Sequence, residues 1–181
     1  KRYKVGAYAE TLASTYGWPI NKWDVSRIQN FSHVFAHKAG FNDVIGSWDV
    51  SNATNMAWMF HRASSFNQDL SSWDTSNVAH MTGMFYKGRA FNQDLSSWNV
   101  SNVTNMSWMF DGAGSFNQDI SSWDVSKVIS MHSMFQCASS FDQDISSWDI
   151  SKVDSMESMF CGASSFTHDL SSWDISNAVP Y

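Results

Sequence analysis

The 181-residue sequence lacks any long apolar run. No stretch approaches the roughly 18 consecutive apolar residues that a membrane-spanning helix needs, and the first residues lack the apolar core of a signal peptide. Basic residues are few, 11 against 17 acidic ones, and no Lys/Arg cluster accompanies the aromatic residues. We therefore expect no membrane span. We also expect no nucleic-acid partner, because the cluster of basic residues that binds a phosphate backbone is missing.

The sequence also lacks a recognisable reaction or metal centre. It contains no Ser-His-Asp set, no phosphate-binding loop, and no carboxylate pair that stands apart from its surroundings. The six His residues share no fixed spacing, and no calcium loop of the D-x-D-x-D-G type occurs. We predict that the protein is not an enzyme and has no cofactor, with Ca²⁺ considered below. A hydrophobic content of 43% and an aromatic content of 15% nevertheless allow a large core.

The dominant feature is a tryptophan at every twenty-fifth position. This strict spacing indicates that one short unit stacks on copies of itself, because a single unit cannot bury its apolar face. We expect a repeat domain over residues 20–181, preceded by a capping helix within residues 1–19. Since the sequence stops soon after the last of these tryptophans, we also expect the native chain to continue past Tyr181. The tryptophans are Trp23, Trp48, Trp73, Trp98, Trp123, Trp148 and Trp173.

Two periodicities alternate within each unit. Around Trp48, apolar Ile45 and Val50 alternate with polar residues, which is typical of a strand. Further on, Met56, Met59, Phe60, Ala63 and Phe66 have helical spacing. The predicted fold class is α/β, a right-handed leucine-rich-repeat-like solenoid with about seven parallel strands and a short helix in each 25-residue coil. The tryptophan, methionine and phenylalanine columns are predicted to form its core.

One segment carries a family resemblance. The string Phe-Asn-Gln-Asp-Ile-Ser-Ser-Trp-Asp-Val-Ser at residues 116–126, continuing through Met131 and Met134-Phe135, resembles the BspA-like branch of the leucine-rich-repeat surface proteins. The resemblance covers residues 20–178. It implies an extracellular or cell-surface protein that functions in adhesion or protein recognition, and it implies no catalytic activity.

An acidic residue follows nearly every repeated tryptophan. Carboxylates on adjacent coils would lie about 5 Å apart and repel one another, so something must offset the repulsion. One interpretation is hydrogen bonding to the flanking serines, such as Ser122 and Ser126 around Asp124, together with water. The other is a row of Ca²⁺ ions, for which Asp49, Asp74, Asp124 and Asp149 are the candidate binding residues. A second acidic row is predicted to cap turns, and it comprises Asp69, Asp94, Asp119, Asp144 and Asp169.

Trp58 and Trp108 break the repeat, because other coils hold His, Gly or Ser at this position. Both lie off the apolar stripe and are predicted to be partly exposed. Exposed tryptophans often bind sugars or partner proteins. The alternative is that they pack over neighbouring side chains such as His61 and Arg62.

Two further modifications are predicted. Cys137 and Cys161 are 24 residues apart, so stacked coils would place them within reach of a disulfide. A disulfide would indicate an oxidising compartment. Asn52 and Asn102 are the glycosylation candidates among the Asn-x-Ser/Thr triplets.

These observations favour a non-enzymatic extracellular or surface protein with a protein or glycan partner. The main alternative is a structural subunit of a larger assembly, formed by self-association through the uncapped C-terminal coil. An ice-binding protein is disfavoured, because the outward residues around each repeated tryptophan are Ser-Asp-Ser instead of regularly spaced Thr.

Overall fold

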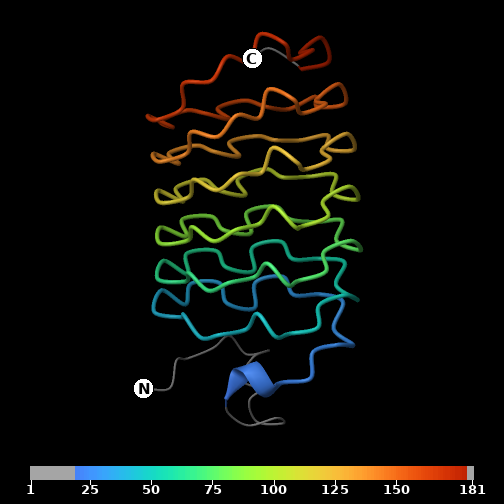
Figure 1. The fold of residues 1–181 in the computed structure, drawn as a ribbon, viewed down its shortest axis with the longest axis vertical. Helices are drawn as coiled ribbons and strands as arrows, with labels where there is room; N and C mark the ends of the chain where they lie inside the picture. Colours follow the sequence, from blue (N-terminus) through green and yellow to red (C-terminus); the bar gives the residue numbers. More distant parts are fainter. Residues whose placement is uncertain (1–18, 179–181) are drawn as a thin grey trace.

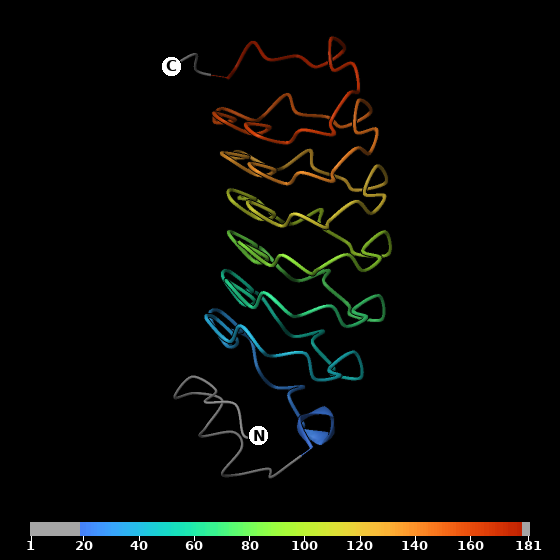
Figure 2. The ribbon, with the colours of Figure 1, turned by 90° about the vertical axis from the view of Figure 1, so that its left-hand side faces the viewer.

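The structure, a computed structural model, describes residues 19–178, which form a stack of coils (Figure 1). Each coil has 25 residues and lies directly against the next, as two perpendicular views agree (Figures 1 and 2). The predicted capping helix lies outside the described residues. The complete coils span residues 20–44, 45–69, 70–94, 95–119, 120–144 and 145–169, and a partial coil follows at 170–178.

Regular secondary structure is almost absent from residues 19–178. The one helix there is the short 3-10 helix η1, Ile20–Lys22, and no strand forms. The predicted leucine-rich-repeat-like solenoid with parallel strands and a helix in each coil is therefore wrong. Parallel pairing is limited to single bridges that join Asn30, Asn55, His80, Asn105, Ser130 and Ser155 in turn.

The helix prediction fails because of where the N–H groups point. In the segment from Asn55 to Ala63, and in its equivalents, here called the methionine segment, alternate N–H groups donate to the next coil. The Trp58 N–H donates to the Thr82 carbonyl at 2.8 Å. The intervening Met59 N–H instead turns back to the Met56 carbonyl at 3.2 Å. An α-helix would send every N–H back four residues, so the helical spacing of apolar residues here belongs to a chain of overlapping turns.

The strand prediction fails because turns flank each repeated tryptophan. The Trp48 N–H donates to the Ile45 carbonyl at 3.0 Å, and the Ala53 N–H donates to the Val50 carbonyl at 2.8 Å. We call residues 45–53 and their equivalents the tryptophan segment.

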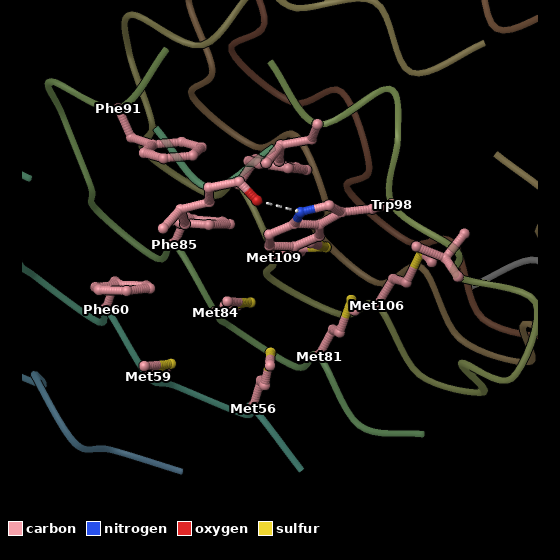
Figure 3. Packing of buried hydrophobic residues seen from close by; sticks show 14 of the residues in the cluster. Met56, Met59, Phe60, Met81, Met84, Phe85, Phe91, Trp98, Met106 and Met109 are labelled. Atoms are coloured by element: carbon pink, nitrogen blue, oxygen red, sulfur yellow. Dashed lines mark hydrogen bonds between the residues drawn. The ribbon is translucent and has the colours of Figure 1, made fainter. Parts of the chain in front are cut away.

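Side chains, instead of a backbone ladder, connect the coils at the tryptophan segment. From Trp48 onwards, each indole N–H of the repeated tryptophans donates to the carbonyl of the Ile or Leu that begins the preceding coil. Trp98 Nε1 donates to the Leu70 carbonyl at 3.0 Å (Figure 3). Ser97 Oγ likewise donates to the Ser71 carbonyl at 2.7 Å. Hydrogen bonding thus holds the coils in register without a sheet.

The predicted core is confirmed. Met84 and Phe85 are fully buried, and Trp98 is 3% exposed. Figure 3 shows the methionines and phenylalanines of successive coils in columns. Phe85 stacks on Phe60 and Phe110, with ring centroids 5.5 and 5.7 Å apart. Offset stacking of this kind adds to the stabilisation from burial alone.

Burial decreases at the last coils. Phe166, Leu170 and Trp173 are only partly buried, and Ile175 is 59% exposed. Each coil therefore depends on both neighbours for the burial of its apolar side chains.

Candidate functional site: the variable face

Sequence differences between the coils occur in five columns that lie close together, and in a separate column that comprises Gln29, Thr54, Ala79, Thr104, Ile129 and Asp154. The five columns run through Ala57, Trp58, His61, Arg62 and Ser64 and the residues 25 positions before and after each of them. One column, for example, reads Ala36, His61, Tyr86, Asp111, Gln136 and Cys161. Their side chains contact one another across coils, as Trp58 and His61 contact Tyr86. We call this surface the variable face. The tryptophan segment, by contrast, differs little between coils apart from the column of Asn52, which holds Arg, Asn or Lys.

Two of these columns have left-handed backbone conformations in every complete coil. Non-glycine residues rarely adopt positive φ, and such strain is often found at functional sites. Trp58 and Trp108 have φ of 61° and 57°. The columns are His33, Trp58, Gly83, Trp108, Ser133 and Ser158, and His37, Arg62, Lys87, Gly112, Cys137 and Gly162.

Trp58 and Trp108 stack on each other across an intervening coil. Their ring centroids are 6.0 Å apart, with an interplanar angle of 29°. Gly83 makes this possible, because a Cβ at that position would collide with the Trp58 indole. Trp58 also packs against His61, with centroids 5.3 Å apart. Both tryptophans remain half-buried, so the predicted partial exposure and the alternative of packing over neighbours are both correct.

Basic residues gather beside the tryptophans. Arg62, Lys87 and Arg89 line a smaller hollow of about 360 Å³, and Lys87 and Arg89 also line a larger hollow of about 760 Å³. No ion pair involves any of the three within residues 19–178. The expectation that no basic cluster accompanies the aromatic residues is wrong here, because stacking brings together residues 25 positions apart. The cluster could have been found by comparing residues 25 positions apart, instead of neighbours along the sequence.

Positive charge also affects the histidines of this face. Burial, followed by the nearby charges of His37 and Arg62, lowers the pKa of His61 to about 4. His61 is therefore neutral at pH 7, whereas Arg62 and Lys87 beside it are charged. The face around Arg62 is electropositive although the whole chain carries a net charge of −6.

Asp111 lies in the larger hollow and was not singled out by the sequence analysis. The residue is only 8% exposed, and its carboxylate accepts no hydrogen bond from the described part of the chain. Burial raises the pKa of Asp111, while the charges of Lys87 and His132 partly oppose the shift. Gly112 and Gly114 also line the hollow, at positions where other coils carry larger side chains such as Arg62 and Arg89. The sequence signal was an acid where other coils hold His, Tyr or Gln.

The predicted acidic row lies on the tryptophan segment, and its repulsion is offset by hydrogen bonds. Asp49 Oδ1 accepts the Ser51 N–H at 3.1 Å and the Ser51 hydroxyl at 2.7 Å. These bonds lower the pKa of Asp49 more than the neighbouring carboxylates raise it. The same bonds from the serine two residues on lower the pKa values of Asp74, Asp124 and Asp149.

The serine interpretation therefore holds for the following serine, but not for the preceding one. Ser122 Oγ donates to the Ser96 carbonyl instead of Asp124. Across residues 19–178 no group of three or more His, Cys, Asp or Glu side chains is arranged to hold a metal ion. The second acidic row caps turns as predicted; Asp69, for example, accepts the Ser71 N–H at 2.8 Å.

Cys137 and Cys161 are both free and exposed, so the predicted disulfide is absent from the structure. The two residues do lie on adjacent coils, because the Cys137 N–H donates to the Cys161 carbonyl at 2.8 Å. However, Cys137 stacks on Gly162, and its Sγ lies 3.2 Å from where a Cβ of that glycine would be. The one-residue offset thus places the Cys137 sulfur beside Gly162.

Asn52 and Asn102, the glycosylation candidates, are exposed on the tryptophan segment. Each side-chain amide donates to a carbonyl of the preceding coil, that of Ser26 or Ser76, at 2.8 Å. Their glycosylation stays a prediction.

A uniform stack with one varied surface defines a repeat protein. A family described as "Mycoplasma protein of unknown function, DUF285" matches residues 7–113 and 95–180, and the chain belongs to this family. The narrower resemblance to BspA-like proteins is not confirmed. Neither a curated protein nor a solved structure matches the chain. The described residues include no helix with the length and apolarity required to span a bilayer.

Proposed function

We propose that this chain is a non-enzymatic repeat protein, located outside the cell or on its surface, that binds another macromolecule in adhesion or protein recognition. The observation that supports this function is the gathering of five variable columns, with aromatic and basic side chains, on the variable face. A stack needs only its hydrogen-bonding and core positions to fold, so the remaining positions are free to specify a ligand. The variable face carries Trp, Tyr and Arg, the residue types most enriched in recognition hot spots.

The repeats themselves supply variants that test this function. Trp58→Ser together with Trp108→Ser introduces the residue that Ser133 and Ser158 provide at the same left-handed position. The matched control is Asp49→Asn with Asp124→Asn, since Asn99 occupies the equivalent position. Wild type and both variants are compared for binding to a panel of extracellular-matrix proteins and an array of glycans.

We expect the tryptophan variant to lose at least about tenfold in affinity, as hot-spot residues do. The control variant should bind like wild type. Loss of binding in the control alone would move the function to the tryptophan segment and contradict the proposal.

A second candidate function is a structural subunit of a larger assembly. It is supported by the partial burial of Trp173 and the 59% exposure of Ile175 at the last coil. Light scattering over a hundredfold range of protein concentration tests it. This function would be favoured over recognition by the variable face if the molecular mass of the wild type increases with concentration while the Ile175→Ser variant keeps the mass of a monomer.

A further inference from the structure

The variable face contains two hollows whose chemistry restricts what can bind there. The larger and smaller hollows share Lys87 and Arg89, so they adjoin. Lys87 continues across both, because its Cγ lies 3.0 Å from where a Cβ of Gly112 would be and its ammonium lies 5.0 Å from the centre of the Tyr86 ring. The side chain at the junction is therefore held in place by its neighbours.

The basic side chains of these hollows are suited to bind an anion. Arg62, Lys87 and Arg89 come from two successive coils and form no ion pair within the described residues. Cations left unpaired beside one another repel, and an anionic ligand would remove that repulsion and form charge-assisted hydrogen bonds.

Asp111 lies in the same hollow and requires that the ligand also supply hydrogen-bond donors. Its residue is more than nine-tenths buried in the larger hollow, and no described residue donates to its carboxylate. The carboxylate oxygens stay accessible to solvent from the hollow, because Asn21 Oδ1 is the one fully buried side-chain nitrogen or oxygen without a partner among the described residues. A ligand that enters the hollow and displaces water from this carboxylate must therefore present hydrogen-bond donors close to its own negative charge.

The walls of the larger hollow are partly aromatic. Tyr86 and Trp108 line it, with Gln136 and the hydroxyl groups of Ser115 and Ser139 beside them. Aromatic rings offer apolar surface to a ring-shaped ligand, while amides and hydroxyls accept or donate hydrogen bonds.

We propose that these hollows bind an acidic polysaccharide, whose sugar rings carry carboxylate or sulfate groups that contact Arg62, Lys87 and Arg89 and hydroxyl groups that donate to Asp111. This inference rests on the proposed function, and it names the chemical class of the ligand. An acidic sugar has both required features on one ring. Duplex DNA or an acidic peptide such as poly-glutamate provides the negative charge, but neither carries hydroxyl groups along its chain that could donate to Asp111.

The experiment measures binding of the full chain to five probes by isothermal titration calorimetry. Polygalacturonate carries carboxylates only and heparin adds sulfates, so the two distinguish the source of the charge. Duplex DNA and poly-glutamate represent the other polyanions, and dextran is the neutral control for the sugar backbone. We expect polygalacturonate or heparin to bind and dextran not to bind.

Variants taken from other coils make the test specific. Arg89→Ser introduces the residue found at Ser64 and Ser139, and should weaken polysaccharide binding by about tenfold. The matched control is Lys127→Asn, which removes the same charge from the tryptophan segment and introduces the residue found at Asn77 and Asn102. The control should leave the affinity unchanged.

Asp111→Ala decides between the ligand classes, and Ala36 shows that the coil accommodates alanine at this position. For a sugar that donates hydroxyl groups to the carboxylate, the substitution should weaken binding about tenfold. For a ligand attracted by charge alone, loss of the negative charge should tighten binding instead. Tighter binding, or a preference for DNA or poly-glutamate, would overturn the proposal.

The outcomes also separate this inference from the proposed function. If no polysaccharide binds, yet Trp58→Ser with Trp108→Ser still abolishes binding to a matrix protein, the ligand class is wrong and the recognition function stands. If neither set of variants on the variable face affects any ligand, both are wrong.

Discussion

At the scale of single residues, the indole nitrogen has a larger role than the apolar pattern indicated. The spacing of the tryptophans predicted burial, and burial is what the structure shows. It did not predict that each indole N–H would replace a backbone bond between coils. The bond from Trp98 to the Leu70 carbonyl lies in a fully buried environment, where an unpaired carbonyl is costly.

Substitution of Trp98 by Phe tests that role. Trp98→Phe keeps an aromatic ring but leaves the Leu70 carbonyl without a donor, so we expect the free energy of unfolding to fall by at least about 1–3 kcal/mol. Urea denaturation followed by circular dichroism measures the loss. Ser97→Ala is the control, because it removes an exposed bond between the same two coils and should cost no more than about 0.5 kcal/mol. Equal losses in the two variants would refute the argument from burial.

At the scale of the structural element, the side chains of the turn form a ladder of their own. Asn92 Oδ1 accepts the Asn117 N–H at 2.9 Å and the Gln118 side-chain amide at 3.0 Å. The same pattern links Asn42 to Asn67 and Asn67 to Asn92. In the fifth coil, Asp142 replaces the asparagine and accepts the Thr167 N–H at 3.0 Å. The ladder requires an acceptor, and it does not require an amide.

Two substitutions at one position separate these requirements. Asn92→Ala removes both bonds, and we expect a loss of about 1–3 kcal/mol, since each neutral hydrogen bond contributes about 0.5–1.5 kcal/mol. Asn92→Asp keeps the acceptor and should remain close to wild type. Both are measured by urea denaturation at pH 7. A loss in Asn92→Asp as large as in Asn92→Ala would contradict the acceptor argument.

The sequence was informative about periodicity and burial and misleading about conformation. Met56, Met59 and Phe60 are buried as their spacing predicted, yet no helix contains them, because their segment divides its N–H groups between the same coil and the next. Helical spacing reports which side chains share a face, and a chain of turns can meet the same requirement. Trp58 and Trp108 were found by their departure from the repeat. Asp111 and the basic cluster were missed, because they become neighbours only through stacking.

At the scale of the whole molecule, the rows of aspartates make stability depend on acid. Hydrogen bonds from serines lower the pKa values of Asp49, Asp74, Asp124 and Asp149 below the ordinary value of 3.8. A lowered pKa in the folded state means that the unfolded chain binds more protons in acid. The stabilisation is complete well above pH 3.8 and is lost as pH falls through the lowered values. Asp111 acts in the opposite direction, because its pKa is raised.

A variant with asparagine at all four positions tests this dependence. Asn99 already caps its turn in the same way, accepting the Ser101 N–H at 3.0 Å. We therefore expect the variant to match wild type at pH 7 in its urea midpoint and to exceed wild type at pH 3, because the aspartates of the unfolded wild-type chain take up protons as the pH falls below 3.8. Midpoints measured from pH 7 to pH 3 give the comparison. An identical decline in both proteins would show that other groups cause the acid sensitivity.

The alternating N–H groups of the methionine segment give the stack a direction. In the first five coils they donate to carbonyls of the following coil, as the Trp108 N–H donates to the His132 carbonyl at 2.9 Å. The two faces that each coil turns to its neighbours are therefore chemically unlike, one offering carbonyls and the other offering donors. A duplicated 25-residue unit inserted between two existing coils would accept hydrogen bonds from the coil before it and donate hydrogen bonds to the coil after it. Such a gene duplication would lengthen the variable face by one coil without requiring any new kind of contact.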